Sequence, residues 1–207
     1  MTWPVGAPPL VAILRGVRPE EVVDIAAALY EAGVRLIEVP LNSPEPFDSI
    51  ERLAKAYGDR CLCGAGTVLT PANVERVHAV GGELIVTPNS DPAVIERAVA
   101  LGQVIMPGFA TATEGFRALQ AGAQHLKLFP AATYGAGHIK ALKSVLPKGV
   151  PVYAVGGVGP AELATWLAAG ADGFGIGGEI YRPGDSAEKV SQNAKALIEA
   201  YAKATAH

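Results

Sequence analysis

The chain lacks any block of basic residues, and its net charge is small. Its 17 lysine and arginine residues are outnumbered by 20 aspartate and glutamate residues, so the formal net charge is −3. Proteins that bind nucleic acid or an anionic membrane surface usually carry clustered positive charge. We therefore expect no nucleic acid and no membrane as partners, while a small anion can still bind to backbone amides and a few well-placed cations.

Long hydrophobic runs are missing as well. Hydrophobic residues make up 50% of the chain, yet no window approaches the roughly 20 apolar residues that a membrane-spanning helix needs. The first six residues, Met1-Thr-Trp-Pro-Val-Gly6, have neither the cationic start nor the apolar stretch of a secretory signal. We therefore expect a cytoplasmic protein.

Cysteine is scarce, with only Cys61 and Cys63 in the chain. Two residues apart on a predicted strand, they point to the same face at a spacing of about 6.6 to 6.8 Å, a poor geometry for a disulfide. A metal site would need further ligands, and no neighbouring His or Cys in the sequence supplies them. We expect two buried apolar cysteines, no metal ion and no cofactor.

Glycine and proline are abundant, and they separate a repeating pattern of short apolar runs. The intervening segments show helical periodicity, with proline near the expected helix starts and glycine just after the expected ends. The prolines are Pro19, Pro71, Pro92 and Pro160, and the glycines are Gly33, Gly82, Gly102, Gly122 and Gly170. The predicted strands are Val11–Arg15, Leu36–Pro40, Cys61–Ala65, Leu84–Thr87, Val104–Pro107, His125–Phe129, Val152–Val155 and Phe174–Ile176.

Eight such strand–helix units predict an α/β fold, a single (β/α)8 TIM barrel domain over residues 1–207. The apolar runs are continuous, as in parallel strands buried on both faces. An open doubly wound sheet is the alternative, and the even spacing and the lack of a Gly-x-Gly-x-x-Gly turn after the first strand disfavour it. In a barrel, chemistry lies at the carboxyl ends of the strands.

Lys127 is the most informative residue, because it interrupts an apolar strand where a buried amine is costly. One interpretation is a structural salt bridge with Glu38 across the barrel, although buried ion pairs are often not stabilising. The functional interpretation is a Schiff-base nucleophile, since burial favours the neutral amine that attacks a ketone. Glu38 is then the proton shuttle, acting as base and afterwards as acid.

Other residues at the strand ends are candidates for binding the substrate. Arg15 presents a planar fork suited to a carboxylate. Thr67 either adds a hydroxyl hydrogen bond or caps the helix that follows. We expect Thr87 and Pro88 to shape the cavity wall, and Phe129 to pack against the lysine, the ligand or the core.

Paired glycines follow the last two predicted strands, where such barrels usually bind phosphate. Glycine lets backbone N–H groups approach phosphate oxygens, and a following helix start favours negative charge. The pairs are Gly156-Gly157 and Gly177-Gly178, and ordinary turn glycines are the alternative.

Six segments together carry a resemblance that covers nearly the whole chain: Ala12–Gly16, Ile37–Pro44, Gly64–Val68, Ile85–Asn89, Leu126–Pro130 and Ala154–Val158. They resemble the class I 2-keto-3-deoxy-6-phosphogluconate and 2-keto-3-deoxy-6-phosphogalactonate aldolases. The resemblance implies a (β/α)8 homotrimer that releases pyruvate and glyceraldehyde 3-phosphate. It implies Schiff-base chemistry at Lys127, acid/base chemistry at Glu38 and pyruvate binding at Arg15 and Thr67. It implies phosphate binding at Gly156, Gly157, Gly177 and Gly178.

Three positions refine the resemblance. Relatives of the gluconate type often carry an arginine where this chain reads Leu41-Asn42-Ser43, and a threonine where it has Val155. We therefore expect the galactonate branch, and galactonate degradation as the context. Relatives often have serine at the position of Gly178, so backbone amides must replace that hydroxyl here.

Other functions remain open from the sequence. A 2-dehydro-3-deoxy-6-phosphogluconate aldolase or a bifunctional enzyme differs by one hydroxyl configuration. A phosphosugar epimerase would use acid/base pairs without a covalent lysine, and a non-catalytic phosphosugar-binding barrel would not need Lys127, Glu38 and Arg15 together.

Overall fold

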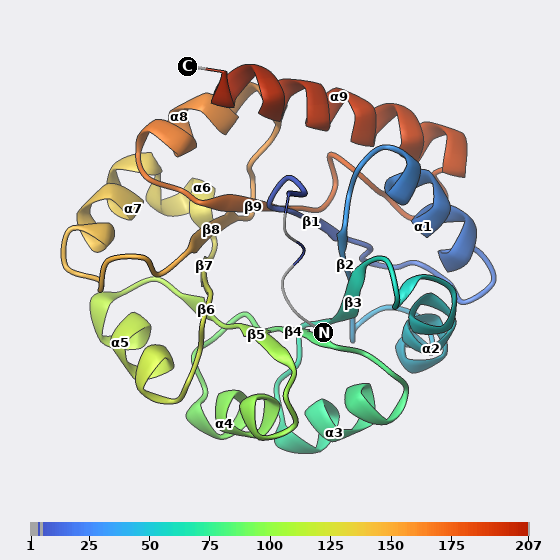
Figure 1. Cartoon of the computed structure of the whole chain (residues 1–207), viewed down its shortest axis with the longest axis horizontal. Coiled ribbons are helices and arrows are strands. Elements are labelled where there is room, and N and C mark those ends of the chain that lie inside the picture. Colours follow the sequence, from blue (N-terminus) through green and yellow to red (C-terminus); the bar gives the residue numbers. More distant parts are fainter. Residues whose placement is uncertain (1–3, 5, 207) are drawn as a thin grey trace.

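The computed structural model describes Pro4 and residues 6–206, and in that part of the chain nine parallel strands wind into a barrel with helices on the outside (Figure 1). The strands are β1 (Leu10–Ile13), β2 (Leu36–Pro40), β3 (Leu62–Gly66), β4 (Leu84–Val86), β5 (Val104–Met106), β6 (Gly108–Phe109), β7 (Leu126–Leu128), β8 (Val152–Val155) and β9 (Gly173–Ile176). The helices are α1 (Val22–Glu31), α2 (Pro46–Tyr57), α3 (Pro71–Ala79), α4 (Pro92–Ala100), α5 (Ala112–Gln120), α6 (Ala131–Tyr134), α7 (Ala136–Lys143), the 3-10 helix η1 (Pro160–Glu162), α8 (Leu163–Ala168) and α9 (Ala187–Thr205).

The strand order around the sheet is β5-β4-β3-β2-β1-β9-β8-β7-β6. Its two end strands, β5 and β6, are consecutive in the sequence and separated only by Pro107. Proline has no N–H for the ladder, but the Pro107 carbonyl accepts a hydrogen bond from Lys127 N (2.9 Å). The barrel is therefore nearly closed at Pro107. The predicted α/β barrel is confirmed, and its described part contains nine strands where eight were expected, because two short strands, β5 and β6, flank Pro107.

Helix boundaries follow local chemistry. Pro71 and Pro92 are the first residues of α3 and α4, where a missing N–H costs nothing. Pro19 lies in the turn before α1, and Pro160 begins η1, so the helix expected after β8 starts as a short 3-10 turn.

The two faces of each strand have different surroundings, because successive side chains point to opposite faces. On β2, Ile37 and Val39 pack in the apolar layer between strands and helices. Leu36 belongs to a second, smaller cluster inside the barrel. Glu38 has the same parity as Leu36 and therefore faces the interior. That second cluster comprises Val11, Ile13, Leu36, Leu62, Leu84, Val86, Val104, Met106, Tyr153 and Val155, with Phe129 packed against it.

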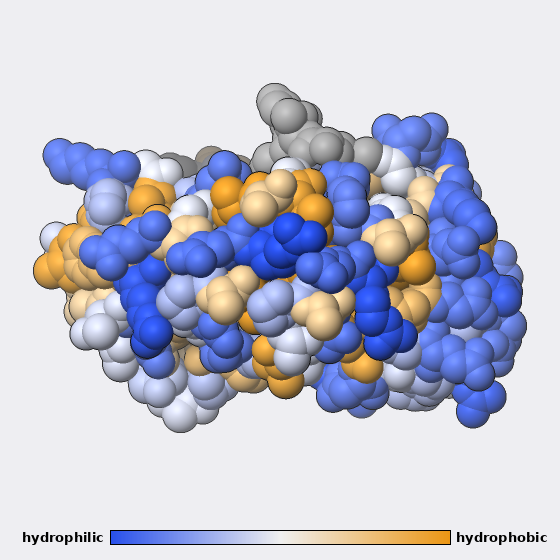
Figure 2. Space-filling model, turned by 90° about the horizontal axis from the view of Figure 1, so that it is seen from below, coloured by the Kyte–Doolittle hydropathy of each residue, from blue (hydrophilic) through white to orange (hydrophobic). Residues whose placement is uncertain are grey.

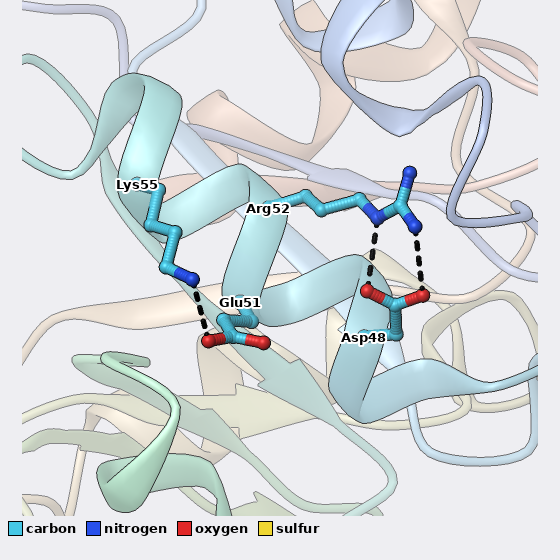
Figure 3. Close-up of polar contacts among 4 residues, drawn as sticks. All are labelled: Asp48, Glu51, Arg52 and Lys55. Atoms are coloured by element: carbon cyan, nitrogen blue, oxygen red, sulfur yellow. Dashed lines mark hydrogen bonds and ion pairs between the residues drawn. The ribbon is translucent and has the colours of Figure 1, made fainter.

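The outer surface is mixed in polarity. On α2, Arg52 donates two hydrogen bonds to Asp48 (2.9 and 3.1 Å), and Lys55 donates one to Glu51 (2.6 Å), both pairs four residues apart and partly exposed (Figure 3). Figure 2 shows hydrophobic residues in small patches among hydrophilic ones on the side that carries α3 and α4. None of the helices in the described part of the chain combines the length and hydropathy needed to cross a bilayer.

Candidate active site

A cavity of about 960 Å³ opens where the strands end. Its lining comes from β1, β2, β3, β4, β7, β8 and β9 or the loops directly after them. It includes ten of the eleven predicted site residues: Arg15, Glu38, Thr67, Pro88, Lys127, Phe129, Gly156, Gly157, Gly177 and Gly178. Residues that lie up to about 160 positions apart in sequence thus share one opening.

Lys127 lies in the middle of β7 and is only 6% exposed. Its neighbours Leu126 and Leu128 pack toward the helices, so the amine faces the cavity, where Nζ lies 4.8 Å from the centre of the Phe129 ring. Burial lowers the pKa of Lys127; the charge of Glu38 opposes this shift and that of Arg15 adds to it. A neutral amine is therefore more accessible here than on a surface lysine.

Glu38, on β2, is 2% exposed. Burial raises the pKa of its carboxyl to about 7, against the opposing charges of Lys127 and Arg15. Its Oε2 atom makes no hydrogen bond within the described part of the chain. A carboxyl with a pKa near neutrality and a free oxygen can both accept and return a proton.

Gly66, on the adjacent strand β3, makes room for Glu38. A Cβ atom at Gly66 would lie 1.8 Å from Glu38 Oε2, so any side chain there would displace the carboxyl. Among the ion pairs of the described residues, none joins Glu38 to Lys127. The two groups influence each other's charge without forming a closed salt bridge.

Arg15 follows β1, and its Nη1 atom donates a hydrogen bond to Asn42 Oδ1 in the loop after β2. The same two loops meet again where Gly16 N donates to Ser43 Oγ (2.9 Å). The hydrogen bond to Asn42 therefore orients the Arg15 guanidinium at the cavity wall. Asn42 was not among the predicted site residues, because its role depends on a contact 27 positions away in sequence.

Thr67 has a left-handed backbone, with φ at +57°, which is uncommon for a residue with a branched side chain. Such conformations concentrate at functional sites. The helix cap that was the alternative role for Thr67 is supplied by Thr70, whose hydroxyl accepts a hydrogen bond from Asn73 N (3.2 Å). Thr67 instead lines the cavity.

Thr87 is the one predicted site residue that lies outside the lining. It is buried, and its hydroxyl donates to the Asn89 carbonyl and accepts from Gly108 N (3.4 Å). These contacts join the loop after β4 to the start of β6, so Thr87 shapes the wall from behind while Pro88 reaches the cavity.

The glycine pairs lie along one side of the cavity. Gly156 and Gly157 have φ values of +96° and +71°, and a Cβ at Gly157 would lie 2.6 Å from Ala132 Cβ. A Cβ at Gly177 would meet nothing within 4 Å. Gly157 is therefore required by the fold, whereas Gly177 leaves open space at the cavity wall.

Several lining residues beyond the prediction follow β9, among them Glu179, Tyr181, Arg182 and Pro183. Arg182 lies four residues after Gly178, and this proximity was a signal available in the sequence. The cysteines are buried and free, as predicted; burial raises the pKa of Cys61 to about 11. In the described part of the chain, no three His, Cys, Asp or Glu side chains are grouped to hold a metal ion.

Comparison with known proteins decides the family. The family model described as KDPG and KHG aldolase matches residues 5–197. The chain belongs to the KDPG and KHG aldolase family. It is thus an aldolase, and the family inferred from the sequence is confirmed. It is 50% identical over 196 residues to the 2-dehydro-3-deoxy-6-phosphogalactonate aldolase of Escherichia coli (strain K12), covering 95% of this chain and 96% of that one.

Solved structures agree with this assignment. The structure described as native KDPGal matches with a TM-score of 0.95 at 50% identity, over 99% of this chain and 98% of that chain. A KDPG aldolase from Legionella pneumophila, with pyruvate captured as a covalent carbinolamine intermediate, matches with a TM-score of 0.81 at 27% identity, over 95% and 94%. The aldolase fold therefore extends over nearly all of this chain.

Proposed function

We propose that this aldolase cleaves 2-dehydro-3-deoxy-6-phosphogalactonate to pyruvate and D-glyceraldehyde 3-phosphate through a Schiff base on Lys127. The observation that carries the proposal is the buried amine of Lys127 facing the same cavity as Glu38, whose pKa burial raises to about 7. The captured carbinolamine in the related Legionella pneumophila enzyme supports a covalent route.

Lys127 starts the reaction as a neutral amine. Its nitrogen attacks the C2 ketone to form a carbinolamine, and loss of water gives an iminium. The iminium accepts the electron pair released when the C3–C4 bond breaks. The lowered pKa of Lys127 supports this role, because the protonated amine has no lone pair to attack with.

Glu38 moves the protons. As a carboxylate it takes the proton of the C4 hydroxyl, so that the new aldehyde forms as the C3–C4 bond breaks. The resulting carboxylic acid then protonates C3 of the enamine, and hydrolysis of the iminium releases pyruvate and the free lysine. A pKa near 7 suits a group that performs both steps at neutral pH.

The remaining residues hold the two ends of the substrate. Arg15 and Thr67 bind the carboxylate next to the ketone, and Arg15 is held ready by Asn42. Phe129 packs against the lysine and Pro88 shapes the wall. The backbone of Gly156, Gly157, Gly177 and Gly178 binds the phosphate.

The preference for the galactonate epimer rests on Val155. This valine lines the cavity directly before Gly156 and has no hydroxyl to donate to the C4 oxygen. The 50% identity to the Escherichia coli galactonate enzyme supports the same preference. A 2-dehydro-3-deoxy-6-phosphogluconate or bifunctional activity is the nearest alternative.

We also propose that the chain is one domain with an eightfold barrel, in which β5 and β6 are one strand interrupted at Pro107. The family match over residues 5–197 supports one domain. A homotrimer, as the family resemblance implies, and a cytoplasmic location complete the proposal. The free thiols of Cys61 and Cys63 are compatible with a reducing compartment.

Trapping with borohydride tests the covalent step. Incubating the protein with pyruvate and sodium borohydride should reduce the Schiff base to a stable secondary amine. Peptide mass spectrometry should then find a pyruvate-derived adduct on Lys127 and none in Lys127→Met, which should also lose turnover. An enzyme that releases pyruvate but carries no such adduct would overturn the Schiff-base mechanism.

The substrate preference is tested by supplying the two C4 epimers separately and following pyruvate release. We expect kcat/KM to be higher for the galactonate epimer, and Val155→Thr to raise the relative rate with the gluconate epimer. Equal values for the two epimers in the parent enzyme would assign it a bifunctional activity.

A further inference from the structure

The cavity has a cation on its glycine-lined side to which the proposed mechanism gives no role. Among the described residues that line it, the cations are Arg15, Lys127 and Arg182. The first two act on the keto-acid end in the proposed function. Arg182 lies in the loop after β9, and its Nε atom donates to the Gly178 carbonyl (2.8 Å). It is therefore attached directly to the loop proposed to bind phosphate.

The backbone around Arg182 is held on both sides. Tyr181 is buried, and its hydroxyl donates to Glu21 Oε1 (2.8 Å). On the other side, Pro183 packs so closely on Gly16 that a Cβ there would lie 2.7 Å from Pro183 Cγ. The Arg182 amide donates to Asp185 Oδ2 (2.8 Å). These contacts hold the backbone of residues 181–183 in place, and this backbone carries the Arg182 side chain at the cavity.

The far end of the Arg182 side chain is available to a ligand. Nε is engaged by Gly178, whereas Nη2 lies 3.7 Å from Glu179 Oε1, beyond hydrogen-bond length. The two side chains are 69% and 55% exposed, and an ion pair of this kind is weak. Nη1 and Nη2 therefore present N–H donors beside the cavity, and Glu179 is only a weakly bound carboxylate partner.

We propose that Arg182 binds the phosphate group of the substrate and exchanges Glu179 for it. A guanidinium matches phosphate oxygens with two parallel N–H donors, and such charge-assisted bonds are strong. Gly177 and Gly178 offer no hydroxyl to the phosphate, and Arg182 can supply a side-chain donor beside their backbone amides. The inference rests on the proposed function, since it assigns a partner to the phosphate end of that substrate.

Kinetics with and without the phosphate group test this role. In Arg182→Gln we expect KM for the phosphorylated substrate to rise about tenfold, equivalent to about 1.4 kcal/mol, with kcat within about twofold. KM for the unphosphorylated substrate, 2-dehydro-3-deoxygalactonate, should stay unchanged. Inorganic phosphate should inhibit the parent enzyme competitively and the variant more weakly, and Arg182→Lys should recover part of the loss.

The Glu179 variant tests the exchange of partners. Glu179→Gln removes the competing carboxylate, so we expect a lower KM for the phosphorylated substrate and stronger inhibition by inorganic phosphate. An unchanged KM in Glu179→Gln would overturn the exchange.

Other results would overturn the role of Arg182 itself. An unchanged KM in Arg182→Gln, or an equal rise for the phosphorylated and unphosphorylated substrates, would remove it from the phosphate site. Borohydride labelling of Lys127 by pyruvate separates this failure from that of the proposed function. If the parent enzyme is labelled but Arg182→Gln shows no selective rise in KM, only the role of Arg182 is overturned. If the parent enzyme is active but not labelled, the Schiff-base mechanism is overturned.

Discussion

The two faces of β2 and β7 differ sharply, although their residues alternate along the same short strands. Ile37 on β2 and Leu126 on β7 face the helices and are completely buried among apolar side chains. Glu38 and Lys127 face the interior, almost as deeply buried, yet each is an ionisable group with a pKa shifted by burial. The outer face supplies stability through apolar burial, whereas the inner face holds ionisable groups in an environment that is unfavourable for their charges.

This difference shows that burial has opposite consequences on the two faces. For an apolar side chain, removal from water stabilises the fold. For Glu38 the same removal favours the protonated acid, so the charged form that the proposed mechanism uses as a base destabilises the folded state. Variants of adjacent residues on β2 can therefore separate catalysis from stability.

Glu38→Gln should have the largest effect on catalysis among these comparisons. Without the carboxyl, no group at this position can take the C4 proton, and we expect kcat/KM to fall by about 10²- to 10⁴-fold. In the parent enzyme kcat/KM should rise with pH through about 7 as Glu38 loses its proton, and this limb should be absent in the variant. If kcat/KM of Glu38→Gln still rose with pH through about 7, the ionisation would belong to another group.

The same substitution should make the protein more stable above neutral pH. The pKa of Glu38 is about 7 in the folded protein and near 4.5 when exposed, so between these values the folded state retains a proton that the unfolded state releases. Stability therefore falls as pH rises from about 4.5 to 7, by up to about 3 kcal/mol. Denaturant unfolding at pH 8 should show Glu38→Gln gaining up to this amount, and the gain should shrink toward pH 4.

Ile37→Ala changes the adjacent residue on the opposite face. Removing a fully buried side chain leaves a cavity between strand and helices, and we expect a loss of about 2 to 5 kcal/mol in the free energy of unfolding. Catalysis per folded molecule, counted by borohydride labelling, should change by less than about threefold if the inner face is undisturbed. A drop in kcat comparable with that of Glu38→Gln would show that the two faces are coupled.

Asp48→Asn gives the smallest expected effect and serves as a surface reference. It weakens the paired hydrogen bonds with Arg52 on α2 (Figure 3), where water competes for both groups. Thermal unfolding should shift by less than about 2 °C, with unchanged activity. A shift as large as that of Ile37→Ala would mean that this pair supports the packing of α2.

Most of the candidate site could be predicted because it follows from strand periodicity and position. Lys127 and Glu38 are unusual in apolar runs, and a barrel brings the carboxyl ends of its strands together. Thr67 could not be distinguished from a helix cap, since two threonines precede Pro71 and only the structure shows that the Thr70 hydroxyl caps α3. Arg182 lies close to Gly178 in the sequence, but only the anchoring of the loop after β9 shows that its side chain lines the cavity.

The sequence by itself determined the α/β barrel, the family and the residues that alternate between the two faces, because periodicity and turn chemistry act over a few neighbouring residues. Tertiary structure alone decided the presence of separate strands β5 and β6 on either side of Pro107, the contact between Arg15 and Asn42, and the space that Gly66 leaves for Glu38. These features join residues from different strands or loops, so they arise only when the barrel forms. The pKa of Glu38 belongs to the same class, since burial and the charges of Lys127 and Arg15 set it from distant parts of the chain.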